Sequence, residues 1–281
     1  MTNLTYTFLN KDTDLINLTR QWEEKGIQSV AMDFEEESNL HVYGEHLCLI
    51  QLYDRENYYI VDALALSPET LKLFLENKME KIMFACASDA AIARKVLNIQ
   101  LNNIFDVRVI AMTLGFMGNL SGLIKRNLKI ETGEDKKKFQ KTNWMKRPLS
   151  EEQIQYALGD VKYLFQLKET LIKELAGSEE KLQKTAAFKM KNCAKQLNPE
   201  KPGWEKICNW KRTPKDVQLY VKEFFLARDK IARRLNRPAG FIMSKSTIVK
   251  MAYEKNYFHS TYDKEFRAAL NNATEKEKKW N

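Results

Sequence analysis

The hydrophobic pattern begins with one amphipathic helix and continues with strands. Apolar residues in 11–25 recur three and four positions apart, which predicts a helix. Short apolar runs follow at residues 28–35, 47–53 and 58–62, and each has the length and composition of a buried strand. Residues 54–57 alone join the last two runs, so we expect an antiparallel hairpin there.

Beyond residue 62 the pattern becomes an alternation of strands and helices. Strand-like runs occur at residues 81–85 and 103–106. Helical patterns are predicted at residues 67–77, 88–97, 107–114, 120–128 and 150–175. Such an alternation indicates a sheet with parallel members between helices, so the expected class is α/β with a mixed sheet.

The remaining segments divide the chain into domains. Residues 131–148 are polar and charged and predict an exposed loop. Two prolines and a glycine between residues 196 and 203 mark the clearest linker, and the chain is helical in pattern from about Thr213. We therefore expect a first domain at residues 1–195, a linker at 196–212 and a small all-α domain at 213–281.

Charge is also unevenly distributed along the chain. The chain carries a formal net charge of +9 at pH 7. Residues 181–281 contain 24 Lys and Arg against 10 Asp and Glu, whereas residues 1–180 contain 22 against 27. An acidic front and a basic rear suggest a catalytic or metal-bearing part joined to a part that binds polyanions. The alternative is a basic surface that only aids solubility.

Several classes of protein are disfavoured. No run of eighteen apolar residues occurs, and the first eight residues lack the apolar stretch of a signal peptide, so we expect a cytoplasmic protein without membrane contact. Four scattered cysteines and three histidines form no zinc pattern. We expect reduced thiols, no disulfides and no structural zinc.

Two carboxylates end the first predicted strand. Because side chains alternate along a strand, Asp33 and Glu35 lie on the same face. Their repulsion and lost hydration are costly unless a cation lies between them, and oxygen ligands suit Mg²⁺ or Mn²⁺. Alternatively, both are solvated residues at a strand end, since short motifs recur by chance.

Three further residues can join this pair. Asp89 follows the strand at residues 81–85 near a helix start, and Tyr156 and Asp160 are four apart on one predicted helix face. Each has a plain alternative: Asp89 as a helix cap, Tyr156 as a core aromatic and Asp160 as a surface residue. Together they place four carboxylates and a tyrosine on elements that can converge at one side of a sheet.

At these residues the chain resembles the ribonuclease D branch of the DEDD 3′–5′ exonucleases, of the type with a tyrosine in the last motif. Residues 32–35 are similar to the first motif, with 38–43 and 47–52 as its continuation, and 84–89 to the second. Residues 144–160 are similar to the third and provide the most specific match.

The resemblance implies a ribonuclease-H-like α/β fold over about residues 28–175. Residues 225–238 are similar to the helical domain shared by helicases and ribonuclease D, which implies an HRDC-like domain in the C-terminal part. Phe84 stands where the family often has His, which leaves substrate preference open. Asp106 lies in another family-like segment, and we interpret it as a supporting residue and not a ligand.

The resemblance also implies the chemistry. Two divalent cations, Mg²⁺ or Mn²⁺, about 4 Å apart would stabilise the attacking and leaving oxygens of a phosphodiester. Asp33, Glu35, Asp89 and Asp160 would hold them, with Asp33 and Asp160 as the shared ligands. Tyr156 would orient the attacking water, because its ordinary pKa near 10 makes it a poor base. Nucleoside 5′-monophosphates would leave from the 3′ end.

Basic and aromatic residues offer candidate nucleic-acid contacts. The candidates are Lys137, Trp144, Arg147, Arg228, Arg233 and Arg234. For the lysines of residues 136–138 the alternative is a solvated loop, and for Trp144 it is a packing role.

The sequence leaves three functions open. The first is an exoribonuclease that trims structured RNA 3′ ends such as tRNA precursors. The second is an exonuclease that prefers single-stranded DNA, since a contact to the 2′-hydroxyl would decide between the two. The third is an inactive fold that binds nucleic acid, which the complete residue set disfavours. No obligate protein partner is evident.

Overall fold

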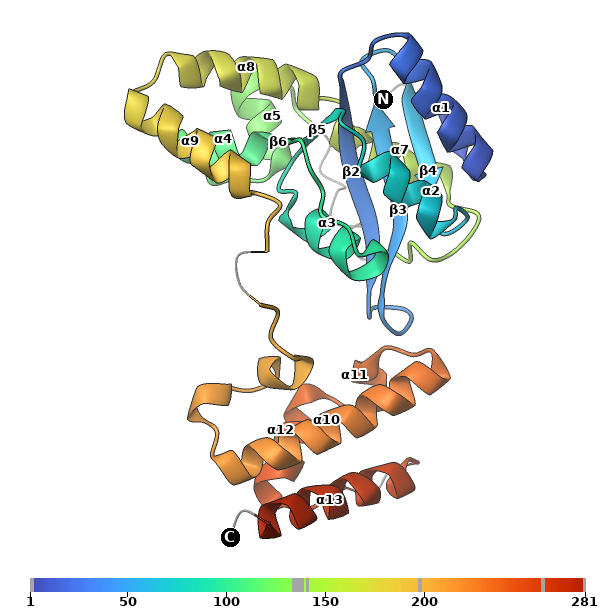
Figure 1. The fold of residues 1–281 in the computed structure, drawn as a ribbon, viewed down its shortest axis with the longest axis vertical. Coiled ribbons are helices and arrows are strands. Elements are labelled where there is room, and N and C mark those ends of the chain that lie inside the picture. The colour runs from blue at the N-terminus through green and yellow to red at the C-terminus, as the bar shows by residue number, and fades with distance from the viewer. Residues whose placement is uncertain (1–2, 133–138, 140–141, 197–198, 259–260, 280–281) are drawn as a thin grey trace. The chain divides into compact units, whose positions relative to one another are not determined.

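The chain forms two compact units (Figure 1). The computed structural model describes residues 3–132, 139, 142–196, 199–258 and 261–279. The first unit comprises Met1–Glu37 and Glu45–Leu197, and the second comprises Ser38–Gly44 and Asn198–Asn281. The linker at residues 196–212 and the domain limits on either side of it stay a prediction.

A six-stranded mixed sheet forms the centre of the first unit, in the order β1-β4-β3-β2-β5-β6. The strands are β1 (Tyr6–Leu9), β2 (Ser29–Ser38), β3 (Glu45–Tyr53), β4 (Tyr58–Asp62), β5 (Glu80–Met83) and β6 (Ile104–Asp106). β3 and β4 pair antiparallel with Tyr53 opposite Tyr58, which confirms the predicted hairpin. β2 with β5, and β5 with β6, pair in parallel, as the alternating pattern predicted.

The sequence pattern missed one strand. β1 lies at an edge of the sheet, parallel to β4, with Tyr6 opposite Tyr58 and Leu9 opposite Val61. Of its side chains only that of Leu9 is buried. A strand with a single buried side chain has no apolar run, so hydrophobic periodicity could not predict it. The structure identifies β1 by its backbone pairing with β4.

Helices pack around this sheet (Figure 1). They are α1 (Asp12–Glu24), α2 (Pro68–Leu75), α3 (Ala87–Ile92), α4 (Val107–Thr113), α5 (Leu120–Leu128), α7 (Glu151–Val161), α8 (Leu164–Ala176) and α9 (Glu180–Asn192). α3 continues as a π-helical turn at Ala93–Leu97. The predicted helix starts are capped: Ser67 accepts from the backbone N–H of Thr70, and Ser150 forms a capping box with Gln153.

The single helix predicted at residues 150–175 is wrong. The chain forms α7 and α8, with a break at Lys162 and Tyr163. Val161 and Leu164 on either side of the break are both buried in the core. Because the apolar spacing continues through the turn, the pattern alone could not reveal the break.

The second unit is helical, as expected. It contains 3₁₀ turns at Gly203–Lys206 and Trp210–Arg212, and the helices α10 (Lys215–Leu235), α11 (Ala239–Ile242), α12 (Lys245–Glu254) and α13 (Asp263–Lys278). Tyr220 and Phe224 of α10 share a core with Phe266 of α13 and Met251 of α12. This packing gives the unit a hydrophobic core of its own.

Candidate active site

Strand β2 carries the first two acidic residues. Its side chains alternate: Val30 and Met32 enter one hydrophobic core, and Ala31 enters another. Asp33 and Glu35 follow Ala31 at intervals of two and therefore lie on its side of the sheet. Both are half-buried, so neither is fully hydrated and their charges interact strongly.

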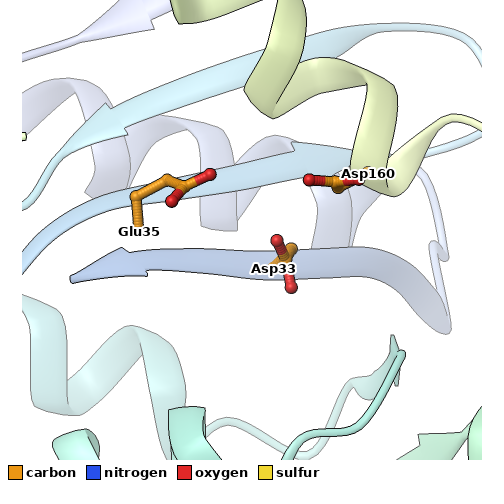
Figure 2. Close-up of side chains that lie close together, drawn as sticks. All are labelled: Asp33, Glu35 and Asp160. Atoms are coloured by element: carbon orange, nitrogen blue, oxygen red, sulfur yellow. The ribbon is translucent and has the colours of Figure 1, made fainter. Parts of the chain in front are cut away.

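Helix α7 supplies the third acidic residue. Its buried residues Ala157, Leu158 and Val161 fix the helix against the sheet, and Asp160 lies next to this apolar face. Carboxylate oxygens of Asp33, Glu35 and Asp160 all lie within 4.8 Å of one another (Figure 2). The strand and the helix thus bring together residues that are more than 120 positions apart in the sequence.

This acidic group fits a divalent cation. Three carboxylates at this spacing repel one another, and a bound cation removes that repulsion. Carboxylate oxygens are the ligands that Mg²⁺ and Mn²⁺ prefer. The described residues can therefore hold a metal ion at the group that the sequence identified.

A glutamine that sequence analysis did not assign supports the group. Gln51 of β3 is fully buried, and its Nε2 donates to Oε1 of Glu35 at 3.3 Å. Its side-chain carbonyl has no hydrogen-bond partner among the described residues. The sequence could have indicated this role, because Gln51 is a lone amide among apolar residues of a predicted strand. A buried amide must find a polar partner.

Tyr156 lies against the acidic group. Burial raises the pKa of its phenol, and the charges of Asp160, Glu35 and Asp33 raise it further. The phenol also hydrogen-bonds the carboxylate of Asp160. Tyr156 is therefore a proton donor at neutral pH and not a base.

Asp89 is not a member of this group of three carboxylates. It is buried on α3, whose Ala90 and Ile92 enter the same core as Phe34. Burial raises the pKa of Asp89 to about 7, and the carboxylate of Glu36 adds to the rise, while the backbone N–H of Phe34 opposes it. The structure thus brings three of the four predicted carboxylates together and places the fourth beside β2 at Phe34.

Asp106 has the supporting role that we expected. Its carboxylate accepts from the backbone N–H groups of Ala85, Cys86 and Arg108, each at 2.9 Å. Ala85 has a φ of +61°, a conformation that non-glycine residues rarely adopt. Asp106 therefore holds the turn from which α3, with Asp89, begins.

Phe84 precedes that turn and is partly buried in the core that includes Ile82 and Phe105. The guanidinium carbon of Arg108 lies 5.8 Å from the centre of its ring. Phe84 thus acts as a packing residue with a cation–π neighbour.

Two predicted nucleic-acid contacts have structural roles. Trp144 is only 2% exposed and packs with Cys48, Leu49 and Ile60, so no base can stack on it. Arg147 donates five hydrogen bonds, one from Nε, two from Nη1 and two from Nη2, so all its N–H groups are used. Its acceptors are both carboxylate oxygens of Asp62 and the backbone carbonyls of Cys48, Trp144 and Lys146. Lys137 lies outside the described residues.

The three candidate contacts on α10, which are Arg228, Arg233 and Arg234, differ in exposure. Arg228 is buried, donates to the carbonyl of Met243 and lies over the ring of Phe225 at 4.7 Å. It belongs to the core of the helical unit and not to its surface. Arg233 and Arg234 are exposed and can meet a nucleic acid, although Arg234 is paired to Glu265 at 2.8 Å.

Comparison with known proteins identifies the fold. A profile of 3′–5′ exonuclease domains matches residues 6–176, more than half of the chain. The chain belongs to the 3′–5′ exonuclease family. The matched segment contains Asp33, Glu35, Asp89, Tyr156 and Asp160.

Similar proteins include ribonucleases D. The chain is 34% identical over 173 residues to ribonuclease D of Haemophilus influenzae, which covers 61% of this chain and 42% of that protein. With ribonuclease D of Desulfotalea psychrophila it shares 28% over 216 residues, 75% of this chain and 57% of that protein. The chain therefore spans about half the length of these relatives.

Solved structures share the fold. The crystal structure of Escherichia coli RNase D matches with a TM-score of 0.73 at 20% identity, over 96% of this chain and 76% of that chain. It confirms the expected exonuclease fold followed by a helical part. Among the described residues, no helix is both long enough and apolar enough to cross a bilayer.

Proposed function

We propose that this protein is a metal-dependent 3′–5′ exoribonuclease that trims structured RNA 3′ ends, such as those of tRNA precursors, and releases nucleoside 5′-monophosphates. One observation carries the proposal: carboxylate oxygens of Asp33, Glu35 and Asp160 lie within 4.8 Å of one another, and the chain belongs to the 3′–5′ exonuclease family. The alternative is an inactive fold that binds nucleic acid. It would be favoured by a substitution at one of the four acidic positions, and all four positions are acidic in this chain.

Asp33, Glu35 and Asp160 would hold one divalent cation, and Asp89 would complete a site for a second. Bound Mg²⁺ or Mn²⁺ would supply Lewis-acid stabilisation of the phosphodiester and an acidified water. The protein would position these ligands: β2 fixes Asp33 and Glu35, Gln51 restrains Glu35, and α7 carries Asp160.

Tyr156 would act as a hydrogen-bond donor. Its raised pKa keeps the phenol protonated at neutral pH. A neutral phenol next to Asp160 can donate to a phosphate oxygen or orient a water for attack on phosphorus. Replacement by Phe would remove the donor and leave the acidic group intact.

RNA is the substrate class that the relatives favour. The Escherichia coli neighbour is described as an exoribonuclease involved in structured RNA processing. Single-stranded DNA is the alternative substrate, because RNA and DNA would use the same acidic group and only a contact to the 2′-hydroxyl would tell them apart. The four cysteines are free thiols, which is consistent with the proposed cytoplasmic location. We propose action without an obligate protein partner.

The direct test uses one sequence made as RNA and as DNA. A 3′-terminal label released as a 5′-mononucleotide, together with stepwise shortening of the 5′-labelled strand, would establish 3′–5′ direction. We expect faster release from RNA, and about 100-fold slower release by Tyr156→Phe at unchanged RNA affinity. Faster release from DNA would favour the alternative substrate. RNA binding without release under any divalent ion would contradict the enzyme.

A further inference from the structure

One face of helix α9 combines lysines with an exposed aromatic ring. Lys181, Lys184, Phe188 and Lys191 follow at intervals of three, four and three residues, so they lie along one face. The opposite face carries Ala186 and Met190, of which Ala186 is buried. The four side chains therefore point away from the core.

Phe188 is the centre of this face. It is 72% exposed, although a Phe gains stability when it is buried. Phe188 lines an open hollow of about 600 Å³ together with Glu180, Lys181, Lys184, Thr185 and Lys189. The ring is thus accessible, and three of the five other residues that line the hollow are lysines.

The charge of the face is positive. α9 holds four lysines and one acidic residue, Glu180. Glu180 pairs with Lys184 at 2.8 Å, but their side chains are 78% and 75% exposed. An exposed pair of this kind contributes little and yields readily to a stronger anion.

We propose that this lysine–Phe188 face binds single-stranded RNA, with one base stacked on Phe188 and phosphates at Lys181, Lys184 and Lys191. An aromatic platform among cations is the combination that binds single strands without sequence preference. From Lys181 to Lys191 the helix rises about 15 Å, which is long enough for several phosphates.

The face lies on the same unit as the acidic group. α9 packs against β6 and α4. In the sheet only β5 separates β6 from β2, which carries Asp33 and Glu35. Strand spacing places β2 and β6 about 10 Å apart. Met190 of α9 packs against the core that contains Ala31, and Ala31 lies on the same side of β2 as Asp33 and Glu35. RNA on the face can therefore run upstream of a 3′ end in the site, an inference that rests on the proposed function.

Binding without chemistry tests this face. Fluorescence anisotropy of a 5′-labelled oligouridylate in EDTA measures affinity while no divalent ion supports cleavage. We expect Phe188→Ala to weaken binding about 5- to 10-fold, the low end of base stacking. Replacement of Lys181, Lys184 and Lys191 by Ala should reduce the slope of log Kd against log salt by about 2.

Leu73→Ala is the matched control, because Leu73 on α2 is 73% exposed. We expect this variant to bind like wild type, and all variants to melt like wild type. Equal affinity and salt slope in all variants would overturn the inference, as would a Phe188 effect without a change in salt slope. Nucleotide release with Mg²⁺ tests the proposed function in a separate assay. A failure of the α9 inference and a failure of the proposed function can therefore be distinguished.

Discussion

Single side chains in the candidate site depend on partners that lie far away in the sequence. Glu35 is the clearest case, because Gln51 of the neighbouring strand donates to it. Hydrogen bonds to a ligand orient it and tune its affinity for metal. An acidic pair in the sequence therefore predicts the ligands, but only the folded sheet shows what restrains them.

Gln51→Met should separate metal binding from stability. Met keeps the approximate volume and removes the donor to Glu35, so Mn²⁺ affinity should fall about tenfold in calorimetric titration. The free energy of unfolding should stay equal or rise, since a buried carbonyl without a partner disappears. Ile50→Val in the same strand should lose about 1 kcal/mol and keep its Mn²⁺ affinity. Wild-type affinity in Gln51→Met would contradict a restraining role.

Lys81 gives a pH dependence of stability. Its ammonium is fully buried and donates to carbonyl oxygens of Asn77 and Met79. Burial lowers its pKa to about 8, from 10.5. The folded state therefore releases this proton before the unfolded state does, and stability due to Lys81 rises from about pH 8 to 10.5.

Urea unfolding of wild type and Lys81→Met at several pH values isolates this group. From about pH 8 to 10.5 the free energy of unfolding of wild type should rise relative to that of Lys81→Met, by on the order of 2 kcal/mol. Parallel pH profiles for the two proteins would show that the pKa of Lys81 is not lowered.

At the level of elements, helix starts and the hairpin could be predicted because capping residues and short connections are local signals. The edge strand β1 and the break between α7 and α8 could not. β1 is determined by its pairing with β4, which is not a local signal. The break between α7 and α8 lies within continuous apolar spacing, so the pattern did not show it. Asp89 is similar: its motif was visible in the sequence, but only the fold shows that its carboxylate lies at the backbone of Phe34 in β2.

Arg147 shows how an element contact replaces a predicted surface role. It joins the segment before α7 to β3 and β4 through Cys48 and Asp62, and Asp62 is buried. Arg147→Ala leaves that carboxylate unpaired and should cost about 3 kcal/mol in urea unfolding.

Arg126→Ala is the control, because Arg126 forms a more exposed pair with Glu174 at 2.6 Å. It should cost less than about 1 kcal/mol. If instead Arg147→Ala keeps its stability and loses RNA affinity with a lower salt slope, Arg147 is a phosphate contact after all.

For the whole molecule, the change from acidic to basic composition comes before the boundary between the two units, because α9 belongs to the first unit. The basic residues 181–281 include both the α9 face and the helices α10 to α13, whereas the acidic group belongs to residues 1–180. Sequence motifs could identify the catalytic candidates because their chemistry is specific. Surface contacts to nucleic acid could not be predicted, since lysine and arginine patterns do not distinguish a buried Arg228 from an exposed Arg233.

The most direct test is release of the 3′-terminal nucleotide from RNA under single-turnover conditions. Wild type should release it with Mg²⁺ or Mn²⁺ and not with EDTA. Asp33→Asn should lose at least about 1,000-fold in rate, because it removes a charge from the group that holds the cation. Glu131→Gln, at an exposed acidic residue, should match wild type. Metal-independent release, or wild-type release by Asp33→Asn, would contradict the account.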